Sequence, residues 1–513
     1  MQHYDVVVIG GGHNALVSAA YLAKAGKKVL LLEKLDYLGG AATSSYTFEG
    51  TDAKLSRYSY LVSLLPQQII DDLGLDIKLA PRRYSSYTPV PGSANGLLVD
   101  KENAVATKES FEAVGAAADY KTWNEFYSRT ESLAKKLFPT VLEPLKTRSE
   151  VQAVIGSDFA DFFERPIGSV IAENFRSDLV RGVVMTDALI GTFAANEDSG
   201  LDANRCFLYH VIGGGTGDWN IPVGGMGQVS GSIAKAAKRF GAELATNAEV
   251  KSISTDRVVT YFQDGEANSV SADFVLSGIA KNQLAKLLPQ IHPEKVQGAQ
   301  VKVNMLLRRL PKLKDPNLSP EAAFGGTFHI NENFDQLQSA YDQAAQGSIP
   351  DPLPCEIYCH SLTDPSILGQ ELQAAGAQTL TVFALHVPHS LVAKIGNDEL
   401  RAKAQEAVLK SLNSVLAEPI EDLVFVGPDG QLCIETKTTQ DLEDALGLPG
   451  GIIFHSPLSW PFAEDEEDLS SPEARWGVAT GVDRIYFCGS SAKRGGAVSG
   501  IGGHNAAMAV LES

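Results

Sequence analysis

Short apolar runs and one glycine-rich segment alternate over the first residues of the chain. Val6–Ile9 is wholly apolar and rich in β-branched side chains, which is typical of a central parallel strand buried on both faces. A glycine-rich segment at 10–15 follows at once, and residues 15–25 have the pattern of a helix that Gly26 would end. The apolar run 28–33 predicts the next strand. The pattern therefore predicts a strand–turn–helix–strand unit and an α/β fold.

The turn at 10–15 has the arrangement glycine-x-glycine-x-x-alanine. Gly10 permits a tight turn, Gly12 lets a pyrophosphate approach the backbone, and Ala15 is small enough for the helix to pack on the strand. Free N–H groups and partial positive charge at the start of the helix suit phosphates. Glu33 follows about 20 residues later, where a carboxylate accepts ribose hydroxyls and disfavours a 2′-phosphate. These features predict an adenine dinucleotide; a glycine-rich loop without a ligand is the alternative.

Later segments favour FAD over NAD. Gly39 and Gly40 would allow a second close approach to the backbone, which suits a dinucleotide that continues into a ribityl chain. Residues 485–489 read as a buried strand, and 501–512 read as a helix that contains two glycines. Each glycine inside a helix lowers the stability of that helix by roughly 1 kcal/mol. We therefore expect a flavin ring to lie against this backbone. The amino terminus of the helix would then stabilise the N1–C2=O edge of the ring. Contact between helices through small residues is the alternative.

Composition narrows the class of protein. The chain has 513 residues, of which 44% are hydrophobic and 20% charged, and its formal net charge is −19 at pH 7. These values exclude wholesale disorder, and the negative charge disfavours nucleic acid as a partner. Five cysteines form no CxxC pair, which favours a reducing, cytoplasmic compartment. The longest uncharged stretch, 6–23, contains the glycine-rich turn, so we expect no integral membrane segment; peripheral membrane contact and the oligomeric state stay open.

Further motifs run along nearly the whole chain. They are Gly39–Ala42, Ser56–Leu61 with Ser63–Leu65, Thr186–Gly191, His210–Gly214, Val223–Gly227, Leu446–Gly451 and the 488–507 tail. Together with the turn at 10–15, this set resembles the phytoene desaturase/carotenoid isomerase superfamily of flavoproteins. Within that superfamily it is most similar to the branch named pyridine nucleotide-disulfide oxidoreductase domain-containing protein 2.

The resemblance implies a glutathione-reductase-type FAD domain interleaved with a substrate domain built on a mixed sheet plus helices. The FAD domain is expected at 1–95, 220–285 and 445–513, and the substrate domain at 96–219 and 286–444. A helical pattern at 224–240 and a strand pattern at 241–253 support the middle FAD segment. The residues expected to bind FAD are Gly10, Gly12, His13, Asn14, Ala15, Glu33, Lys34, Gly39, Gly40, Ala41, Ala42, Val250, Gly489, Ser490, Ala497 and Val498.

Two segments depart from the family pattern. Lys493 and Arg494 stand where the family has a histidine–proline pair before its glycines, which is expected to place two cations near phosphate or flavin. The acidic run 463–468 lies in the neighbourhood where the family tends to have an arginine–proline pair. We expect this run to be a solvated surface loop, and we expect no metal site in the chain.

The branch name suggests disulfide chemistry, but the residues contradict it. A flavin disulfide reductase needs two neighbouring cysteines that face the ring, and alanines follow Gly40 at that position. Cys355 and Cys359 would lie some 13 Å apart on a strand that rises about 3.3 Å per residue. The chain offers no second dinucleotide-binding unit. Electrons are therefore expected to pass from the substrate to flavin and then to oxygen or a quinone-like acceptor.

Dehydrogenation by flavin needs a C–H bond held against N5 and a proton acceptor. The candidates in motif positions are Asp187, His210 and His455, with 452–455 read as a strand on the substrate side of the flavin; Tyr58 and Tyr60 are read equally well as cavity or core residues. The leading hypothesis is an FAD-dependent oxidoreductase that desaturates or oxidises a hydrophobic or partly hydrophobic organic substrate by hydride transfer to N5. A redox-neutral isomerase, a flavin-bearing binding or assembly protein with little turnover, and an amine oxidase are the alternatives.

Overall fold

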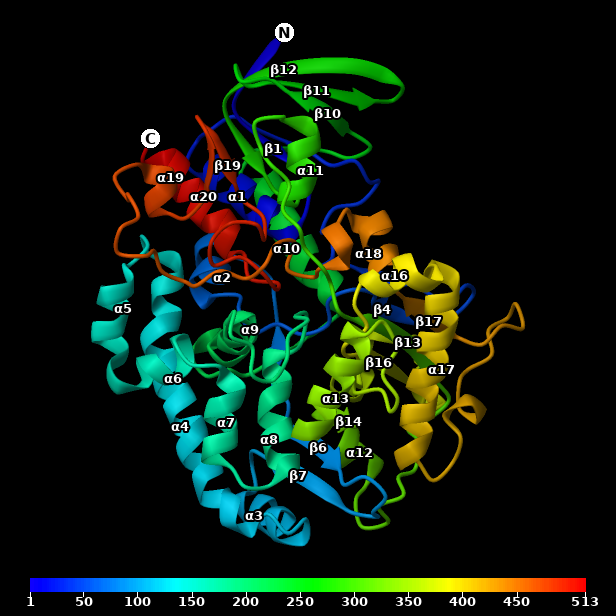
Figure 1. The fold of residues 1–513 in the computed structure, drawn as a ribbon. Coiled ribbons are helices and arrows are strands. Elements are labelled where there is room, and N and C mark those ends of the chain that lie inside the picture. Colours follow the sequence, from blue (N-terminus) through cyan, green and yellow to red (C-terminus); the bar gives the residue numbers. More distant parts are fainter.

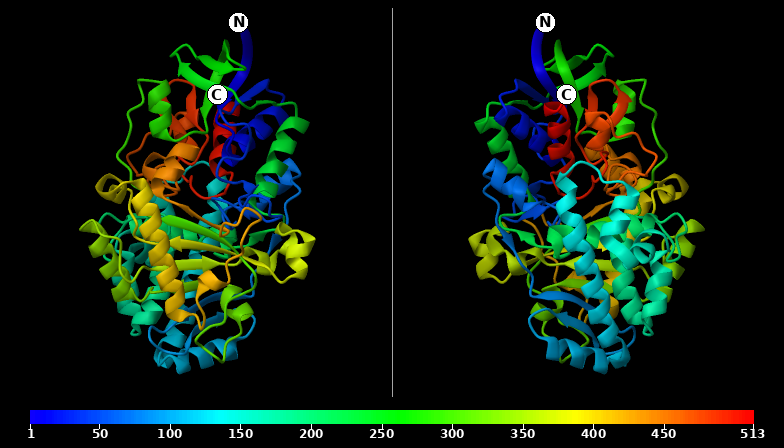
Figure 2. Two further views of the ribbon diagram at one scale, coloured as in Figure 1. Left: turned by 90° about the vertical axis from the view of Figure 1, so that its right-hand side faces the viewer. Right: turned by 90° about the vertical axis from the view of Figure 1, so that its left-hand side faces the viewer.

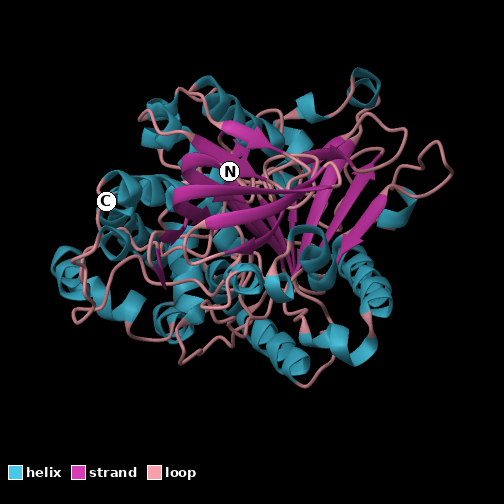
Figure 3. Ribbon diagram, turned by 90° about the horizontal axis from the view of Figure 1, so that it is seen from above, coloured by secondary structure: helices cyan, strands magenta, loops and turns pink.

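Two β-sheets form the framework of the protein. The computed structural model describes all 513 residues. One sheet lies in the upper lobe of Figure 1, where the two chain termini also lie, and the other lies in the lower lobe. From above, the strands occupy the middle of the molecule and helices surround them (Figure 3). No helix combines the length and the apolar character that crossing a bilayer would require.

The upper sheet has eight strands and a parallel centre. β1 (Gln2–Ile9) pairs in parallel with β2 (Val29–Leu32) and β12 (Glu266–Ser277), β2 with β9 (Glu243–Ala245), and β12 with β19 (Ile485–Phe487). β10 (Glu249–Ile253) and β11 (Val258–Gln263) extend it as an antiparallel hairpin beside β12, and β18 (Ala479–Val482) pairs with β19. The expected strand–turn–helix–strand unit at the start of the chain is therefore present.

Three helices from distant parts of the chain form a layer on this sheet. α1 (His13–Lys24) packs between α10 (Met226–Arg239) and α20 (Ile501–Leu511). The blue and red helices in Figure 1 show the two ends of the chain side by side. The first buried core combines the apolar faces of these helices with β1, β2, β12 and β19. The amino- and carboxyl-terminal segments are thus parts of one folding unit.

The glycines of α20 contact protein backbone rather than marking a ligand. A Cβ added to Gly503 would lie 1.9 Å from the carbonyl oxygen of Asn14 in α1, and one added to Gly502 would lie 2.6 Å from the oxygen of Gly489. The sequence interpretation that a flavin ring presses on these two residues is therefore wrong. The small residues let α20 approach α1 and the end of β19 closely.

The lower sheet has seven strands in the order β17 (Ile434–Lys437), β13 (Val301–Leu307), β16 (Gln378–Ala384), β15 (Cys355–Tyr358), β14 (Thr327–Ile330), β6 (Tyr84–Pro89) and β7 (Gly96–Asp100). All neighbours are antiparallel except β14 and β6, so the sheet is mixed, as expected. The expected domain boundary at 95/96 falls between β6 and β7, which pair with each other in this sheet.

Helices cover both faces of the lower sheet (Figure 2). α17 (Asn397–Val415) packs on one face through Leu400, Ala404, Val408 and Leu412. The opposite side holds a helical layer with a phenylalanine-rich core of its own. Its helices are α3 (Ala104–Ala113), α4 (Tyr120–Leu137), α5 (Arg148–Ile155), α6 (Phe159–Phe163), α7 (Ile167–Asn174), α8 (Asp178–Met185) and α9 (Asp202–Val211).

Shorter elements connect these layers. They are β3 (Ser44–Tyr46), β4 (Lys54–Ser56), α2 (Gln67–Leu73), β5 (Leu79–Ala80), β8 (Ile221–Pro222), α11 (Lys281–Leu287), α12 (Pro320–Phe324), α13 (Phe334–Ala345), α14 (His360–Thr363), α15 (Gln370–Ala374), α16 (Ser390–Ile395), α18 (Thr439–Leu446) and α19 (Pro472–Arg475).

Candidate active site

The carboxyl ends of the parallel strands β1 and β2 open into a cavity of about 280 Å³, here called the glycine-loop cavity. Its walls come from the loop between β1 and α1, the ends of β2 and β12, the start of β10, the end of α18 and the turn after β19. Segments from the beginning, middle and end of the chain therefore meet at one site. Ligands of open α/β sheets bind at this edge of the sheet.

The glycine loop has the geometry that a phosphate site needs. Gly10 has a φ of +87°, which is strained for any other residue, and its missing Cβ would lie 2.8 Å from Ile279. A Cβ on Gly12 would meet nothing within 4 Å, so this backbone is open toward the cavity. Gly12 is also the N-cap of α1, which begins without an acidic side chain in its first turn. The free N–H groups at this helix start are thus available to an anion.

Glu33 has a structural task beyond the one expected from sequence. Its Oε2 accepts a hydrogen bond from the N–H of Gly11 at 2.6 Å, and its Oε1 accepts one from Leu35 at 2.8 Å. The carboxylate therefore braces the glycine loop against the end of β2. Each oxygen retains a lone pair, so contact with ribose hydroxyls stays compatible with this arrangement.

Most of the residues expected to bind FAD line the glycine-loop cavity. They are Gly10, Gly12, His13, Asn14, Ala15, Glu33, Lys34, Gly40, Ala41, Val250, Gly489 and Ser490. Four expected residues do not line it. The N–H of Gly39 bonds to the oxygen of Gly11 behind the loop at 2.8 Å, and Ala42 and Val498 are packed into the first core. The backbone of Ala497 faces the ring of His13.

Three buried polar side chains at the loop lack a partner for one of their atoms. These atoms are Nε2 of His13, Oδ1 of Asn14 and Nδ1 of His455. Burial lowers the pKa of His13 to about 4, with a smaller contribution from His455, whose own pKa burial also lowers to about 4. Both imidazoles are therefore neutral at physiological pH. Unpaired buried donors and acceptors around an open backbone cradle fit a polar ligand such as a dinucleotide.

The segment around His455 is a turn, so the strand expected at 452–455 is wrong. The N–H of His455 bonds to the oxygen of Ile452 at 3.1 Å, and His455 has a φ of 67°. Positive φ values at Gly450 and Gly451 also keep the chain from extending. His455 consequently lines the glycine-loop cavity, apart from the other two expected catalytic residues.

A second cavity of about 320 Å³, here called the polar cavity, lies between the lower sheet and the helical layer. Fewer than half of its 24 lining residues are hydrophobic. Strands β6, β14 and β15 form one wall and helices α4, α8 and α9 form the other. Two of the expected catalytic residues, Asp187 and His210, line this cavity together with Tyr60.

His210 presents one ring nitrogen to the polar cavity. Its Nδ1 lies 2.8 Å from the carbonyl oxygen of Cys206, and because a carbonyl only accepts, Nδ1 carries the proton and Nε2 has the free lone pair. The ring stacks on Trp219 with centroids 5.2 Å apart. Burial lowers the pKa of His210 to about 4, which keeps the ring neutral. His210 is thus a fixed hydrogen-bond acceptor.

Asp187 is the ionisable group in the polar cavity with a pKa near neutrality. Burial, and then the nearby Glu356, raise its pKa to about 7, while Arg82 acts in the opposite direction. Glu356 accepts hydrogen bonds from the hydroxyls of Thr186 at 2.7 Å and Tyr358 at 2.6 Å. Asp187, whose pKa lies near the working pH, is therefore suited to general base chemistry.

The walls of the two cavities are joined at two places. The N–H of Ser59, next to Tyr60 of the polar cavity, bonds at 3.3 Å to the oxygen of Ala41 in the glycine-loop cavity. Phe454, next to His455, packs in a small cluster with Cys206, one helical turn before His210. A ligand that extends from the glycine loop past Ala41 and His455 would therefore head toward the polar cavity.

Sequence reasoning missed Arg82, Glu356 and Lys302. Lys302 of β13 is buried and donates hydrogen bonds to the carbonyl oxygens of Ser56 at 3.0 Å and Tyr58 at 2.8 Å. The sequence held a sign of two of these residues. Lys302 of β13 and Glu356 of β15 are charged residues inside mainly apolar strands. Charged residues in such strands indicate a strand face that meets polar groups of the protein rather than solvent.

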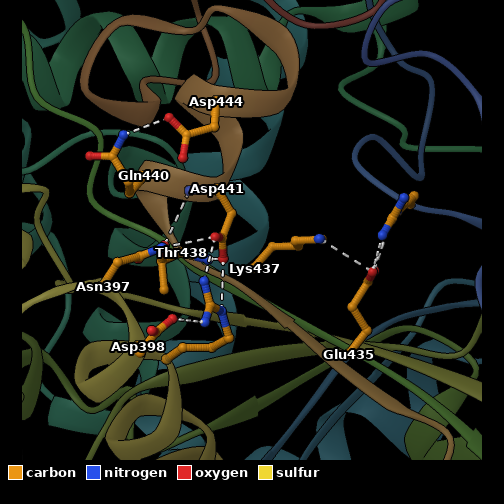
Figure 4. A network of polar contacts seen from close by, with 10 residues as sticks. Asn397, Asp398, Glu435, Lys437, Thr438, Gln440, Asp441 and Asp444 are labelled. Carbon is orange, nitrogen blue, oxygen red and sulfur yellow. Dashed lines mark hydrogen bonds and ion pairs between the residues drawn. The ribbon is translucent and has the colours of Figure 1, made fainter.

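A polar network ties the segment with Tyr60 to the lower sheet and to α18 (Figure 4). Arg57 makes a bidentate ion pair with Glu435 of β17, with one N–O distance of 2.9 Å, and Lys437 lies 3.5 Å from the same carboxylate. Asp441, in the first turn of α18, accepts from Arg401 at 2.6 Å and from Asn397 at 2.9 Å. Because α18 ends at the glycine-loop cavity, this network fixes one wall of that cavity relative to the sheet.

The two cations expected near phosphate or flavin lie elsewhere. Lys493 pairs with Glu467 at 2.6 Å, and Arg494 is buried and donates to the carbonyl oxygens of Thr140, Glu143 and Trp476. Arg494 thus joins the carboxyl-terminal segment to the helical layer, and that interpretation of the two cations was wrong. Within the acidic run, Asp465 accepts from the N–H of Ser149 at 2.9 Å at the start of α5.

The cysteines contribute no redox pair. All five are buried and free, and none lines either cavity. Burial raises the pKa of Cys355 and Cys359, so both remain thiols at neutral pH. The geometry therefore contains no dithiol that could exchange electrons at the glycine-loop cavity.

Comparisons with known proteins agree with this geometry. A family model described as NAD(P)-binding Rossmann-like domain matches residues 8–67, and one described as flavin containing amine oxidoreductase matches residues 67–306. An uncharacterized protein of Mycobacterium tuberculosis is 52% identical over 99% of this chain and 97% of its own length. Pyridine nucleotide-disulfide oxidoreductase domain-containing protein 2 of Mus musculus is 30% identical over 99% of this chain and 93% of its own.

Two further matches are more distant. Prolycopene isomerase of Daucus carota is 23% identical over 74% of this chain and 61% of its own length. A solved structure of a putrescine oxidase variant superposes with a TM-score of 0.61 at 18% identity, covering 100% of both chains. At that identity the superposition establishes a shared fold.

Proposed function

The chain belongs to the family of flavin-dependent oxidoreductases that includes pyridine nucleotide-disulfide oxidoreductase domain-containing protein 2, and on that premise we propose that it uses FAD to dehydrogenate a small, partly hydrophobic organic substrate in the polar cavity. The observation that carries the proposal is the adjacency of the two cavities. One offers a phosphate cradle and an acidic residue in ribose-binding position, and the other holds an ionisable group with a pKa near 7.

The glycine-loop cavity supports FAD as the flavin. Gly12 and the start of α1 suit a pyrophosphate, and Glu33 suits the adenosine ribose without a 2′-phosphate. Val250, at the start of β10, suits the adenine. Bound FAD would supply a two-electron acceptor that takes a hydride at N5. The expected Gly40 and Ala41 lie on the side of the cavity that leads to the polar cavity.

The polar cavity favours a substrate with an apolar body and one polar end. Trp123, Tyr127 and Val183 offer apolar surface, whereas Asp187, which follows α8, and Glu356 of β15 offer carboxyl groups. A volume of about 320 Å³ is at the low end for small-molecule sites and suits a compact substrate rather than a long polyene. The description of the matching family model, amine oxidoreductase, favours an amino group at the polar end.

The chain's own residues supply the proton chemistry. In this proposal the substrate loses a hydride from the carbon that bears its amino or hydroxyl group, and Asp187 takes the proton from that group. His210 accepts a hydrogen bond through its free Nε2 and thereby orients the same polar end. Oxygen or a quinone-like acceptor would then reoxidise the cofactor.

Anaerobic flavin bleaching tests the proposal. Purified protein should bind one FAD per chain, and a fraction of cell metabolites or an amine collection should bleach its absorbance band, while NADPH should not do so rapidly. Asp187→Asn should keep the FAD and lower the bleaching rate at least tenfold, whereas Asp398→Asn, which removes an exposed carboxylate on α17, should not. Failure to bind flavin, or equal rates in the two variants, would reject the proposal.

The product distinguishes a second candidate, a redox-neutral isomerase using reduced FAD. The similarity to prolycopene isomerase favours it. An isomerase would convert its substrate into a product of unchanged mass without net bleaching. A dehydrogenase product would be lighter by two hydrogens, so mass spectrometry separates the two. A flavin-bearing protein without turnover would give neither change.

A further inference from the structure

A buried cluster at the floor of the polar cavity has the donors of a metal site. His329 of β14, Glu332 just after β14 and Glu356 of β15 each offer one ligand atom, and these atoms lie within 4.8 Å of one another. All three side chains are buried, and His329 and Glu356 also line the polar cavity. From this arrangement we infer a binding site for a divalent transition metal ion at the floor of the polar cavity.

Glu332 is the residue that requires an explanation. It is fully buried, and neither of its carboxylate oxygens has a hydrogen-bond partner in the protein. The neighbouring hydroxyl of Thr186 has one proton, which Glu356 accepts at 2.7 Å. A buried carboxylate without a donor is strongly disfavoured. It is relieved either by a proton, which burial favours by raising the pKa of Glu332, or by a bound cation, which the neighbouring His329 and Glu356 would help to hold.

The backbone is shaped to place Glu332 in this position. Asn331, directly before it, has a φ of 59° and turns the chain at the end of β14. Gly182 in the middle of α8 makes room, because a Cβ there would lie 1.8 Å from the carbonyl oxygen of Glu332. Both features cost stability where they occur. Together they set the backbone of Glu332 directly against α8.

One of the two tautomers of His329 leaves a lone pair facing the cluster. Its Nδ1 lies 3.0 Å from the hydroxyl oxygen of Thr88, and its Nε2 lies 3.9 Å from Oε1 of Glu356, which is too far for a hydrogen bond. With the proton on Nδ1, Nε2 and the carboxylate face each other as two electron-pair donors. A neutral imidazole with a free ring nitrogen is the form of histidine that binds metals.

The separations suit a single ion. Metal–ligand bonds of about 2.1 Å place ligand atoms about 3.4 Å apart at a tetrahedral ion and about 4.2 Å apart in trans positions of an octahedral one. The ligand atoms here lie within 4.8 Å of one another, so they must move together by roughly 0.5–1.5 Å when an ion binds. One histidine with two carboxylates is typical of zinc, manganese or iron(II). Three protein ligands also leave a coordination position that opens toward the polar cavity. The site does not depend on flavin, and it departs from the expectation from sequence that the chain has no metal site.

Direct metal binding tests the inference. Protein dialysed against a chelator should bind one Zn²⁺ or Mn²⁺ per chain by calorimetry, with the metal retained through gel filtration and detected by mass spectrometry. Glu332→Gln should weaken binding at least a hundredfold. Thr88→Val, which removes the partner that orients His329, should weaken it about 10- to 100-fold. Glu418→Gln, which removes a partly exposed carboxylate paired with Arg309 far from the cluster in sequence, should bind like the wild type.

The outcomes are distinguishable from those of the proposed function. Circular dichroism and thermal unfolding show whether each variant is folded, and Thr88→Val tests the site if Glu332→Gln does not fold. Absence of binding by the folded wild type, or equal affinity in the folded variants at 88 and 332, would overturn the metal site. Flavin bleaching without metal binding would leave the proposed function intact, and metal binding without bleaching would leave the site intact.

Discussion

Replacing Gly503 by alanine tests how the two ends of the chain are held together. Gly503 lies in α20 where that helix crosses α1, and a Cβ there would lie 1.9 Å from the oxygen of Asn14 and 3.0 Å from the nitrogen of Ser18. Both neighbours belong to the backbone of α1, so neither can move aside by rotating a side chain. The substitution must therefore push α20 away from the helix that carries the glycine loop.

The expected cost follows from this overlap. The added carbon would sit about 1.5 Å inside ordinary contact distance. Overpacking of a buried site typically costs about 1–3 kcal/mol, and rigid backbone on the opposing side favours the upper end. Alanine regains roughly 1 kcal/mol through its higher helix propensity. We expect a net loss of about 2 kcal/mol, which is up to about 30-fold in the unfolding equilibrium.

Gly231 provides the matched control. It lies inside α10, in the same helical layer, and a Cβ there would meet nothing within 4 Å. Gly231→Ala should therefore raise the free energy of unfolding by about 0.5–1 kcal/mol. Urea unfolding followed by circular dichroism should place the midpoint of Gly231→Ala above the wild type and that of Gly503→Ala below it.

Flavin content adds a functional readout, because displaced α1 carries the phosphate-binding turn. Gly503→Ala should retain less FAD than Gly231→Ala after gel filtration. Equal stability of Gly503→Ala and wild type would refute the reasoning, since it would mean that the helices are not in backbone contact. An increase of similar size in the free energy of unfolding of Gly503→Ala and Gly231→Ala would refute it as well.

Three further substitutions have defined outcomes. Glu33→Gln removes the charged acceptor that braces Gly11 and should weaken FAD affinity by about 1.5–3 kcal/mol, measured by flavin fluorescence titration. Arg494→Met should lower the free energy of unfolding by several kcal/mol because it removes the donor to three carbonyl groups, of which the contact with Trp476 is buried. The neighbouring Lys493→Ala should change it by less than about 1 kcal/mol, as urea unfolding can show. Burial lowers the pKa of Lys302 to about 7, so the unfolded chain binds this proton more tightly than the folded protein does. The free energy of unfolding should therefore rise as pH increases from about 7 toward 10. Lys302→Met should remove that rise in denaturation curves taken across this range.

The upper lobe could be predicted from the sequence because its signals are local. The buried strand β1, the glycine turn and helix α1 are consecutive, and each follows from apolar pattern and glycine chemistry within about 30 residues. The strand expected at 485–489 corresponds to β19. The pairing of β6 with β14, by contrast, joins residues far apart in sequence, and no local pattern specifies it.

The candidate site was predictable to the same extent. Glycine spacing and the position of Glu33 identified the glycine loop and the acidic residue of the glycine-loop cavity, and the later motifs added Val250, Gly489 and Ser490. The polar cavity draws Arg82, Asp187, His329 and Glu356 from separate elements, so only the fold brings them together. His455 was misplaced because an apolar run was read as a strand, although the preceding glycines favour the turn that the structure has.

The two cavities obtain their electrostatics in different ways, and this difference bears on where specificity resides. In the glycine-loop cavity both His13 and His455 are neutral, so an anionic ligand is met by backbone N–H groups and the dipole of α1, together with the side chains of Lys34 and Lys286. The backbone groups are set by the fold and persist through most substitutions. In the polar cavity all the charged groups are side chains, which single substitutions can change; they are Arg82, Lys101, Asp187, Asp218 and Glu356. Changes of substrate among proteins of this fold should therefore arise in the lower lobe, while cofactor binding is held constant by the upper one.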